Sequence, residues 1–105
     1  MNTEIEVTEA VRLFIESCNR DTHSKIIKTI DLLCDYGHEL RMPHVKIVMH
    51  GIHELRILGR ESVRIFYVFY QSRAILFYAI EKKTQRLSKQ DMQHILRKMG
   101  DLSLD

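Results

Sequence analysis

The sequence predicts a single α+β domain, in which an N-terminal helical hairpin packs on a twisted antiparallel sheet of about four strands and a C-terminal helix follows. Residues 51–83 hold the densest β-branched and aromatic runs of the chain, each of strand length. Apolar residues before and after this stretch recur at helical spacing instead. With 105 residues, the chain suffices for one core, so residues 1–105 should form one domain.

Two helices are predicted in the first third of the chain. Thr8 is a suitable N-cap for a helix that ends near Cys18. A second helix should run from about Thr22 to Tyr36, where Gly37 suits its C-terminal end. The apolar stripes of both helices need a sheet to cover them. A short edge strand around residues 4–7 would precede the hairpin.

The remaining elements are predicted from apolar runs and their boundaries. Ser88 followed by Asp91 resembles a capping box, so a C-terminal helix should begin there and end near Gly100. The strands are expected at residues 45–49, 53–58, 63–70 and 74–80.

A two-residue turn at Gln71 and Ser72 should join the last two strands, with Tyr70 opposite Arg73. The same register gives three further opposed pairs: Arg64 with Ala79, Phe66 with Phe77, and Val68 with Ile75.

The preceding pair of strands depends on the length of its loop. A three-residue loop, residues 59–61, would place Arg56 opposite Arg64 and Glu54 opposite Phe66, whereas a loop of two or four residues would turn Arg56 to the other face. Two opposed arginines repel each other unless an anion lies between them, and phosphate suits the guanidinium geometry. The alternative, slightly favoured on spacing alone, pairs each arginine with its own carboxylate, such as Glu54 or Glu61.

Composition adds few constraints. The formal net charge of +2 is too small by itself to indicate nucleic-acid binding. No apolar stretch reaches membrane-spanning length and no signal peptide is evident, so we expect a cytoplasmic protein with no membrane partner. His50 and His53 form an H-x-x-H pair, with His44 nearby, but without a further fixed ligand we expect no metal and no cofactor.

Three short motifs occur in order: GIHELR at residues 51–56, VRIFY at 63–67 and IEKKT at 80–84. Together they resemble the RelE/ParE toxin superfamily, in its HigB-like, phage-associated branch. That branch typically reads glycine, apolar, aromatic, ELR; then YRI-aromatic-Y; then F-x-KK-T. The chain departs from this pattern at His53, Val63 and Ile80, where aromatic residues are usual.

The resemblance implies the toxin of a type II toxin–antitoxin system, neutralised by a cognate helix-turn-helix antitoxin. Such toxins cleave mRNA, usually on the ribosome, and family members generally use no metal. The 2′-hydroxyl attacks the adjacent phosphate while basic side chains stabilise the added charge. Carried over by position, the resemblance implies a catalytic set of Arg56, Arg64, Lys83 and Glu54. A carboxylate held near the cations could accept the 2′-hydroxyl proton, and Lys83 beside its cationic neighbours could serve as general acid. We expect further RNA contacts from Lys46, Lys82, Arg86, His44 and His53.

Two other functions remain open at this point. A ParE-like DNA gyrase inhibitor would share the fold but lack the catalytic cations. A catalytically inactive RelE-fold binding protein would keep the fold alone. Cations at Arg56, Arg64 and Lys83 favour the endoribonuclease over the gyrase inhibitor.

Overall fold

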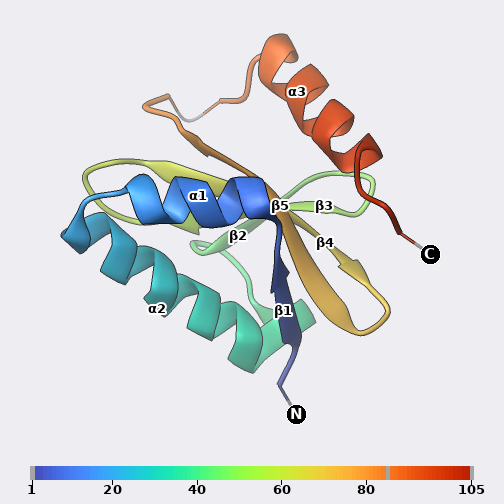
Figure 1. Ribbon diagram of the computed structural model, residues 1–105, viewed down its shortest axis with the longest axis horizontal. Coiled ribbons are helices and arrows are strands. Elements are labelled where there is room, and N and C mark those ends of the chain that lie inside the picture. Colours follow the sequence, from blue (N-terminus) through green and yellow to red (C-terminus); the bar gives the residue numbers. More distant parts are fainter. Residues whose placement is uncertain (1, 85, 105) are drawn as a thin grey trace.

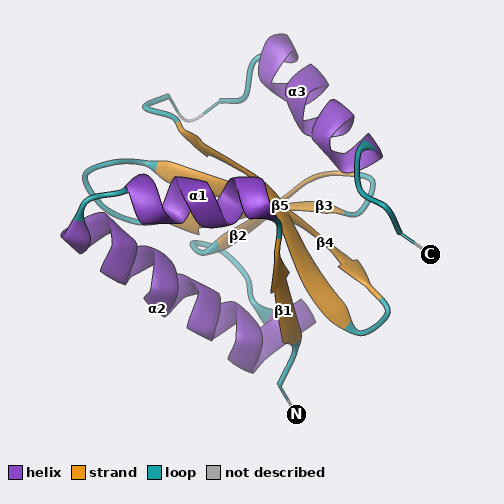
Figure 2. Ribbon diagram, in the orientation of Figure 1, coloured by secondary structure: helices purple, strands orange, loops and turns teal. Residues whose placement is uncertain are grey.

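The computed structural model describes residues 2–84 and 86–104, which form one sheet with helices on both faces (Figures 1 and 2). The α+β class is confirmed. Across the sheet the strand order is β1-β5-β4-β3-β2. In chain order the elements are β1 (Glu4–Val7), α1 (Glu9–Ser17), α2 (Arg20–Tyr36), the 3-10 helix η1 (Gly37–Glu39), β2 (Val45–Met49), β3 (Ile52–Ile57), β4 (Val63–Tyr70), β5 (Arg73–Glu81) and α3 (Lys89–Gly100).

The caps of the two N-terminal helices are set by local side-chain hydrogen bonds. The Thr8 hydroxyl accepts the Val11 N–H at 3.5 Å, as the sequence predicts for the start of α1. The Asn19 side chain accepts the Thr22 N–H at 2.8 Å. Because Asn19 is the N-cap, α2 begins at Arg20, two residues before the predicted start.

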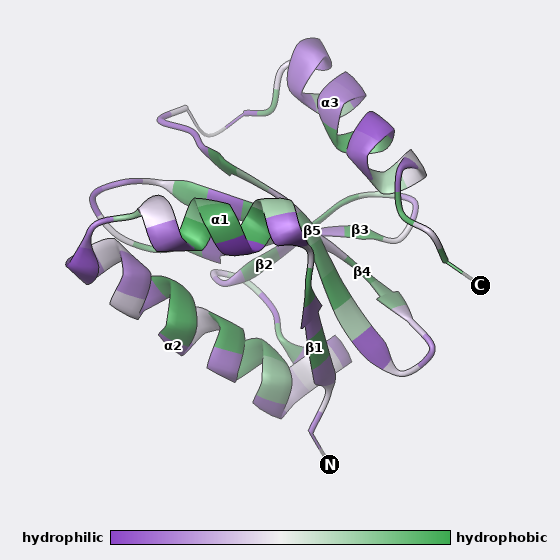
Figure 3. Cartoon of the chain, viewed as in Figure 1, coloured by the Kyte–Doolittle hydropathy of each residue, from purple (hydrophilic) through white to green (hydrophobic). Residues whose placement is uncertain are grey.

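Helices α1 and α2 cover one face of the sheet, which we call the hairpin face. Apolar residues of both helices and of the central strands are buried together there, and Figure 3 shows the hydropathy of these elements. Ile26 and Leu33 of α2 are fully buried, as the predicted helical stripe requires. The buried members of this core are Val11, Ile15, Ile26, Leu33, Val45, Leu55, Ile57, Val63, Ile65, Tyr67, Ala74 and Leu76.

Helix α3 packs on the other face, which we call the α3 face (Figure 1). Its start is fixed by the predicted capping box: the Ser88 hydroxyl accepts the Asp91 N–H at 3.0 Å, and the Asp91 carboxylate accepts the Ser88 N–H at 2.8 Å. Lys82, just after β5, forms an ion pair with Asp91 at 2.6 Å. The buried core here consists of Ile52, Phe66, Val68, Ile75, Phe77 and Ile95.

The sheet has one strand more than predicted, and it is mixed rather than antiparallel. β1 pairs in parallel with β5, with Glu4 opposite Arg73 and Val7 opposite Leu76. The sequence indicated an edge strand at residues 4–7 but not its partner. An ion pair between Arg73 and Glu6, at 3.2 Å, links the two strands at this edge.

The β4–β5 hairpin confirms part of the predicted register. Gln71 and Ser72 both have positive φ, as a type I′ turn requires, and Tyr70 lies opposite Arg73. Val68 also faces Ile75, but a bulge between Phe66 and Tyr67 then shifts the pairing by one residue. The predicted partners Ala79 for Arg64 and Phe77 for Phe66 are therefore wrong. The observed pairs are Arg64 with Ile80 and Phe66 with Tyr78.

The β3–β4 register matches the prediction from a three-residue loop. Arg56 lies opposite Arg64, and Glu54 lies opposite Phe66. Since opposed residues share a face, the carboxylate and both guanidinium groups start from the α3 face.

Candidate functional site

The Glu54 carboxylate lies between the two opposed arginines. Arg56 Nε donates to Glu54 Oε1 at 2.9 Å, and Arg64 Nη1 donates to Glu54 Oε2 at 3.1 Å. Only 1% of the Glu54 side chain is exposed, against 9% for Arg64 and 15% for Arg56. A carboxylate this deeply buried needs such partners, because an unpaired buried charge is very costly.

This geometry corrects the interpretation that spacing alone favoured. The arginines do not have separate carboxylates: Glu54 bonds to both of them. Glu61 instead accepts a hydrogen bond from the Asn19 side chain, at the turn between α1 and α2. The anion that relieves the repulsion between the two guanidinium groups is therefore an internal one.

The arginine pair borders a hollow of about 150 Å³, which we call the arginine hollow. A guanidinium has five N–H donors, and one from each arginine is used on Glu54. With two guanidinium groups and one carboxylate, the cluster has a formal charge of +1. It can therefore offer both N–H donors and positive charge to an anion. The hollow is lined by Arg56, Ile57, Leu58, Gly59, Ser62 and Arg64.

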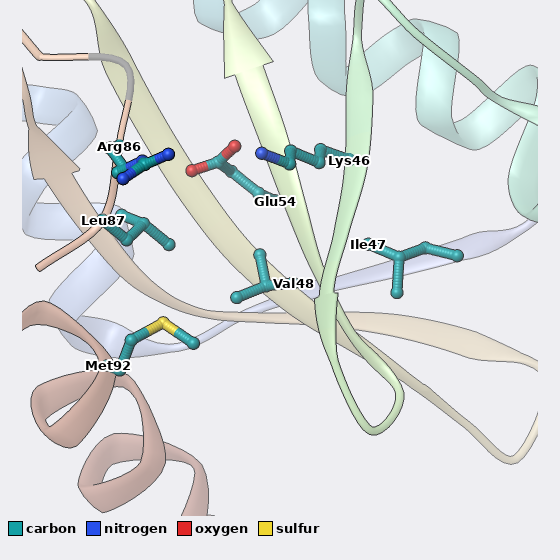
Figure 4. A pocket seen from close by; sticks show the side chains of 7 residues that line it. All are labelled: Lys46, Ile47, Val48, Glu54, Arg86, Leu87 and Met92. Carbon is teal, nitrogen blue, oxygen red and sulfur yellow. The ribbon is translucent and has the colours of Figure 1, made fainter. Parts of the chain in front are cut away.

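A second hollow, of about 220 Å³, lies where Glu54 faces Lys46 and Arg86; we call it the Glu54 hollow (Figure 4). Lys46 comes from β2, directly opposite Glu54 in the register, while Arg86 comes from the segment between β5 and α3. Figure 4 shows the Glu54 carboxylate between the Lys46 ammonium and the Arg86 guanidinium. The apolar part of the wall consists of Ile47, Val48, Leu87 and Met92.

The two lysines after β5 are placed differently. The Lys82 side chain forms an ion pair with Asp91, and the Lys82 backbone N–H donates a hydrogen bond to the Ser62 carbonyl at 2.9 Å. The Lys82 ammonium is the main reason that the pKa of Asp91 is lowered. Lys83 is exposed in the bend that follows. Its predicted approach to the arginine pair stays a prediction.

The two histidines of the predicted RNA-binding set are not gathered around Glu54. His53 precedes Glu54 and faces the hairpin side, where its ring stacks on Tyr67 at 5.1 Å between centroids. Burial lowers the pKa of His53. His44 precedes β2, and its carbonyl accepts the Arg56 N–H at 2.7 Å. Its Nδ1 is buried without a hydrogen-bond partner among the described residues.

The site residues predicted from the sequence therefore lie in separate places in the structure. Glu54, Arg56 and Arg64 converge, and Lys46 and Arg86 line the adjoining hollow. The apolar contribution of Leu87 and Met92 was not predicted. The predicted capping box at Ser88 located the start of α3 but carried no information on where the helix packs.

Among the described residues, no three His, Cys, Asp or Glu side chains are grouped as a metal site would require, and none of the described helices is long and apolar enough to cross a membrane. No curated protein matches the chain. The family model described as phage-derived protein Gp49-like (DUF891) matches residues 14–100. That match spans most of the chain, so the protein belongs to the Gp49-like family, which is related to the RelE-like toxins of toxin–antitoxin systems.

Proposed function

We propose that this protein is a HigB-like toxin that cleaves mRNA on the ribosome without a metal. The observation that carries the proposal is the opposed pair of Arg56 and Arg64, held on one sheet face by the shared carboxylate of Glu54. Preorganised cations beside a hollow are what RNA phosphodiester cleavage needs from a protein. Membership of a toxin-related family supports this use of the cations.

The proposed reaction proceeds within the RNA. The 2′-oxygen attacks the adjacent phosphorus, its proton is removed, and the bond to the 5′-oxygen of the next nucleotide breaks. That 5′-oxygen takes up a proton, and a 2′,3′-cyclic phosphate remains. Negative charge accumulates on the non-bridging oxygens in the transition state. Arg56 and Arg64 would bind these oxygens, and Lys46 and Arg86 would bind neighbouring phosphates.

Glu54 has two possible roles in this reaction. As a general base it would accept the 2′-hydroxyl proton. As a positioning residue it would only hold the two guanidinium groups in place. Its burial and its two arginine bonds favour the positioning role. An ionised carboxylate has about four acceptor sites, so the bonds do not exhaust its capacity.

The pH profile of cleavage by Glu54→Gln separates these roles. The glutamine side chain has the size of glutamate and keeps one acceptor oxygen, but it carries no negative charge. If Glu54 only positions the arginines, the variant should be slower over the whole pH range with the same profile shape. If Glu54 is the base, the limb on the acidic side of the profile should disappear.

The proposed function is tested by mRNA cleavage on translating ribosomes. Loss of one preorganised cation should cost roughly 3 kcal/mol of transition-state stabilisation, so Arg64→Ala should be about a hundredfold slower. Arg64→Lys should recover only part of the rate, since it lacks the guanidinium fork. The matched control is Arg12→Ala, because Arg12 is an exposed arginine that also pairs with glutamates.

Thermal melts must show that each variant is folded. A folded Arg64→Ala protein that cleaves at the parent rate would exclude the site. Failure of the parent to cleave, combined with inhibition of DNA supercoiling, would favour the ParE-like alternative instead.

We further propose that the toxin acts in the cytoplasm and is neutralised by a helix-turn-helix antitoxin. Family membership supports an antitoxin partner in general terms. Expression of the chain alone should slow bacterial growth, and co-expression of the antitoxin should restore it. The control is Arg64→Ala, which should be harmless at equal expression. Normal growth at high soluble levels of the parent protein would contradict an active toxin.

A further inference from the structure

The outer side of strand β2 is an open edge of the sheet. In the order β1-β5-β4-β3-β2, β2 has a neighbour on one side only among the described strands. The Arg56 N–H donates to the His44 carbonyl, so residue 44 bonds inward to β3. Because inward and outward pairs alternate in an antiparallel ladder, Lys46 bonds inward to Glu54, and the N–H and C=O of Ile47 point outward.

Ile47 is also unusually exposed for an apolar strand residue. Its relative exposure is 66%, and that of Met42, in the preceding loop, is 59%. An exposed apolar residue on an unpaired edge is a template for another strand. Lys46, the only charged residue in β2, is exposed, and it lines the hollows on either side.

Two hollows of different chemistry flank this edge. The Glu54 hollow presents the cations Lys46 and Arg86 on either side of the Glu54 carboxylate, which is already paired with Arg56 and Arg64. A hollow of about 260 Å³, here called the ring hollow, is lined by Lys46 and Ile47 as well as by a cluster of four rings. In that cluster His38 stacks on Phe69 with centroids 3.6 Å apart. The four rings are His38, His53, Tyr67 and Phe69.

The opposite edge of the sheet is built differently. β1 has only four residues, and two of them, Glu4 and Glu6, are exposed carboxylates. Short length and charge are common ways to prevent an edge strand from pairing with another chain. β2 carries a register shift between Ile47 and Met49, which limits the ladder to a few residues but leaves Ile47 open.

We propose that the β2 edge binds an extended segment of a partner protein in which acidic and apolar residues alternate. The segment would add a strand beside β2 through the outward N–H and C=O of Ile47. Successive side chains of a strand point to opposite faces, so its acidic residues would enter the Glu54 hollow and its apolar residues the ring hollow. Lys46 and Arg86 provide the charge complementarity.

Charge also distinguishes this partner from a second copy of the chain. Pairing of two β2 edges would bring the Lys46 and Arg86 cations of both copies together, and like charges at close range are unfavourable. An acidic segment neutralises them instead. RNA could neutralise them too, but it has no peptide groups to continue the ladder.

Binding at this edge would compete with RNA for the Glu54 hollow. Only this competition rests on the proposed function, because the ladder and the two hollows exist whether or not the protein cleaves RNA. A partner segment of this kind would therefore act as an inhibitor without touching the guanidinium groups in the arginine hollow.

The test uses a fluorescent nine-residue peptide with blocked ends that alternates glutamate and isoleucine. Fluorescence anisotropy should show saturable binding to the parent protein. A peptide with lysine in place of glutamate should bind at least tenfold more weakly, as should a peptide N-methylated at alternate residues, which loses its backbone donors. Sedimentation of the protein alone should show a monomer.

Ile47→Pro removes the outward N–H of Ile47 and leaves the inward bonds of Lys46 in place, and proline is tolerated at such edge positions. It should weaken peptide binding about tenfold, the size expected for one lost ladder contact. The matched control is Ile47→Val, which keeps the N–H and should bind as the parent does. Arg86→Ala should weaken binding severalfold and reduce its dependence on salt.

Absence of saturable binding to the parent, or equal binding of the N-methylated peptide, would overturn the proposal. The comparison with the N-methylated peptide tests the proposal even if Ile47→Pro fails to fold. A dimer that is lost in folded Ile47→Pro would assign the edge to a second copy of the chain. A protein that binds the peptide but cannot cleave RNA would refute the proposed function and leave the docking edge intact.

Discussion

The two faces of the sheet bury different chemistry. On the hairpin face, α1 and α2 cover an apolar core to which Leu55 and Ile65 contribute. On the α3 face, the same two strands carry Glu54, Arg56 and Arg64 beside the smaller core under α3. Glu54 and Leu55 are adjacent in the chain and almost equally buried, yet one is charged and the other aliphatic.

This difference shows what makes a buried charge tolerable in a small domain. Leu55 needs only apolar neighbours, whereas Glu54 needs both arginines to replace the water that it has lost. The arginines in turn keep donors directed at the arginine hollow. The hairpin face thus stabilises the fold by burial alone, and the α3 face holds charge in a fixed geometry that a ligand can use.

The largest expected effect comes from removing the shared carboxylate. Glu54→Ala leaves two opposed and mostly buried guanidinium groups without an anion, so we expect a loss of about 3–5 kcal/mol in the free energy of unfolding. Urea unfolding measures this loss. The control is Glu16→Ala, whose exposed pair with Arg12 should contribute little to stability. Equal, small losses for both variants would show that the α3 face is merely a solvated surface.

A double-mutant cycle of Arg56→Ala and Arg64→Ala sharpens the comparison. After the first substitution Glu54 keeps one arginine bond, but after both it keeps neither. We therefore expect the double variant to lose about 1 kcal/mol more than the sum of the single losses. Repulsion between the arginines acts with the same sign, because either single substitution already relieves it. A double loss equal to the sum in urea unfolding would show that the two arginines do not act as a unit.

The attachment of α3 should depend on pH through Asp91. The hydrogen bond from Lys82 and the backbone N–H of Ser88 lower the pKa of this carboxyl below its ordinary value of 3.8. Because the pKa is lower in the folded state, the stabilisation is present above about pH 4 and is lost as the pH falls through the folded-state value. Asp91→Asn should thus lower the melting temperature at pH 7, and the difference from the parent should shrink in acid.

The control for this pH effect is Asp31→Asn, at an exposed position of α2 away from α3. Its melting temperature should follow that of the parent at both pH 7 and pH 3. A difference for Asp91→Asn that stays constant from pH 7 to pH 3 would contradict the role of the ion pair.

The smallest effect concerns the turn that sets the register between β4 and β5. Ser72 has φ of 64°, a conformation that glycine adopts without the Cβ penalty. Ser72→Gly should therefore raise the free energy of unfolding by about 0.5 kcal/mol. This gain in stability should not be confined to one face of the sheet, and the rate of RNA cleavage should be unchanged. A loss of stability in urea unfolding would mean that the Ser72 side chain has a role that the turn geometry does not explain.

Strand periodicity made much of the site predictable. A period of two and a three-residue loop were enough to place Arg56 opposite Arg64. The same rule also separates His53 from Glu54, since neighbouring strand residues point to opposite faces. His53 therefore points away from Glu54, and its predicted contact with RNA stays a prediction.

Other features could not be read from the sequence. The bulge at Phe66 and Tyr67 adds one residue to β5, and no glycine or proline marks it. The shared bonding of Glu54 depends on distances across two strands and on burial of the site, which periodicity does not report. The parallel partner of β1 lies far away in the chain, so no local pattern could identify it.

The pairing of β1 with β5 has a consequence during translation. Residues 4–7 leave the ribosome early, but their partner is residues 73–76, which are made several seconds later at typical rates of elongation. Until then β1 has no neighbour in the sheet, and β5 is also needed to complete the ladder beside Arg64. The nascent chain cannot assemble the arginine site before most of it has been synthesised. If the protein cleaves RNA as proposed, cleavage cannot begin before that point in its synthesis.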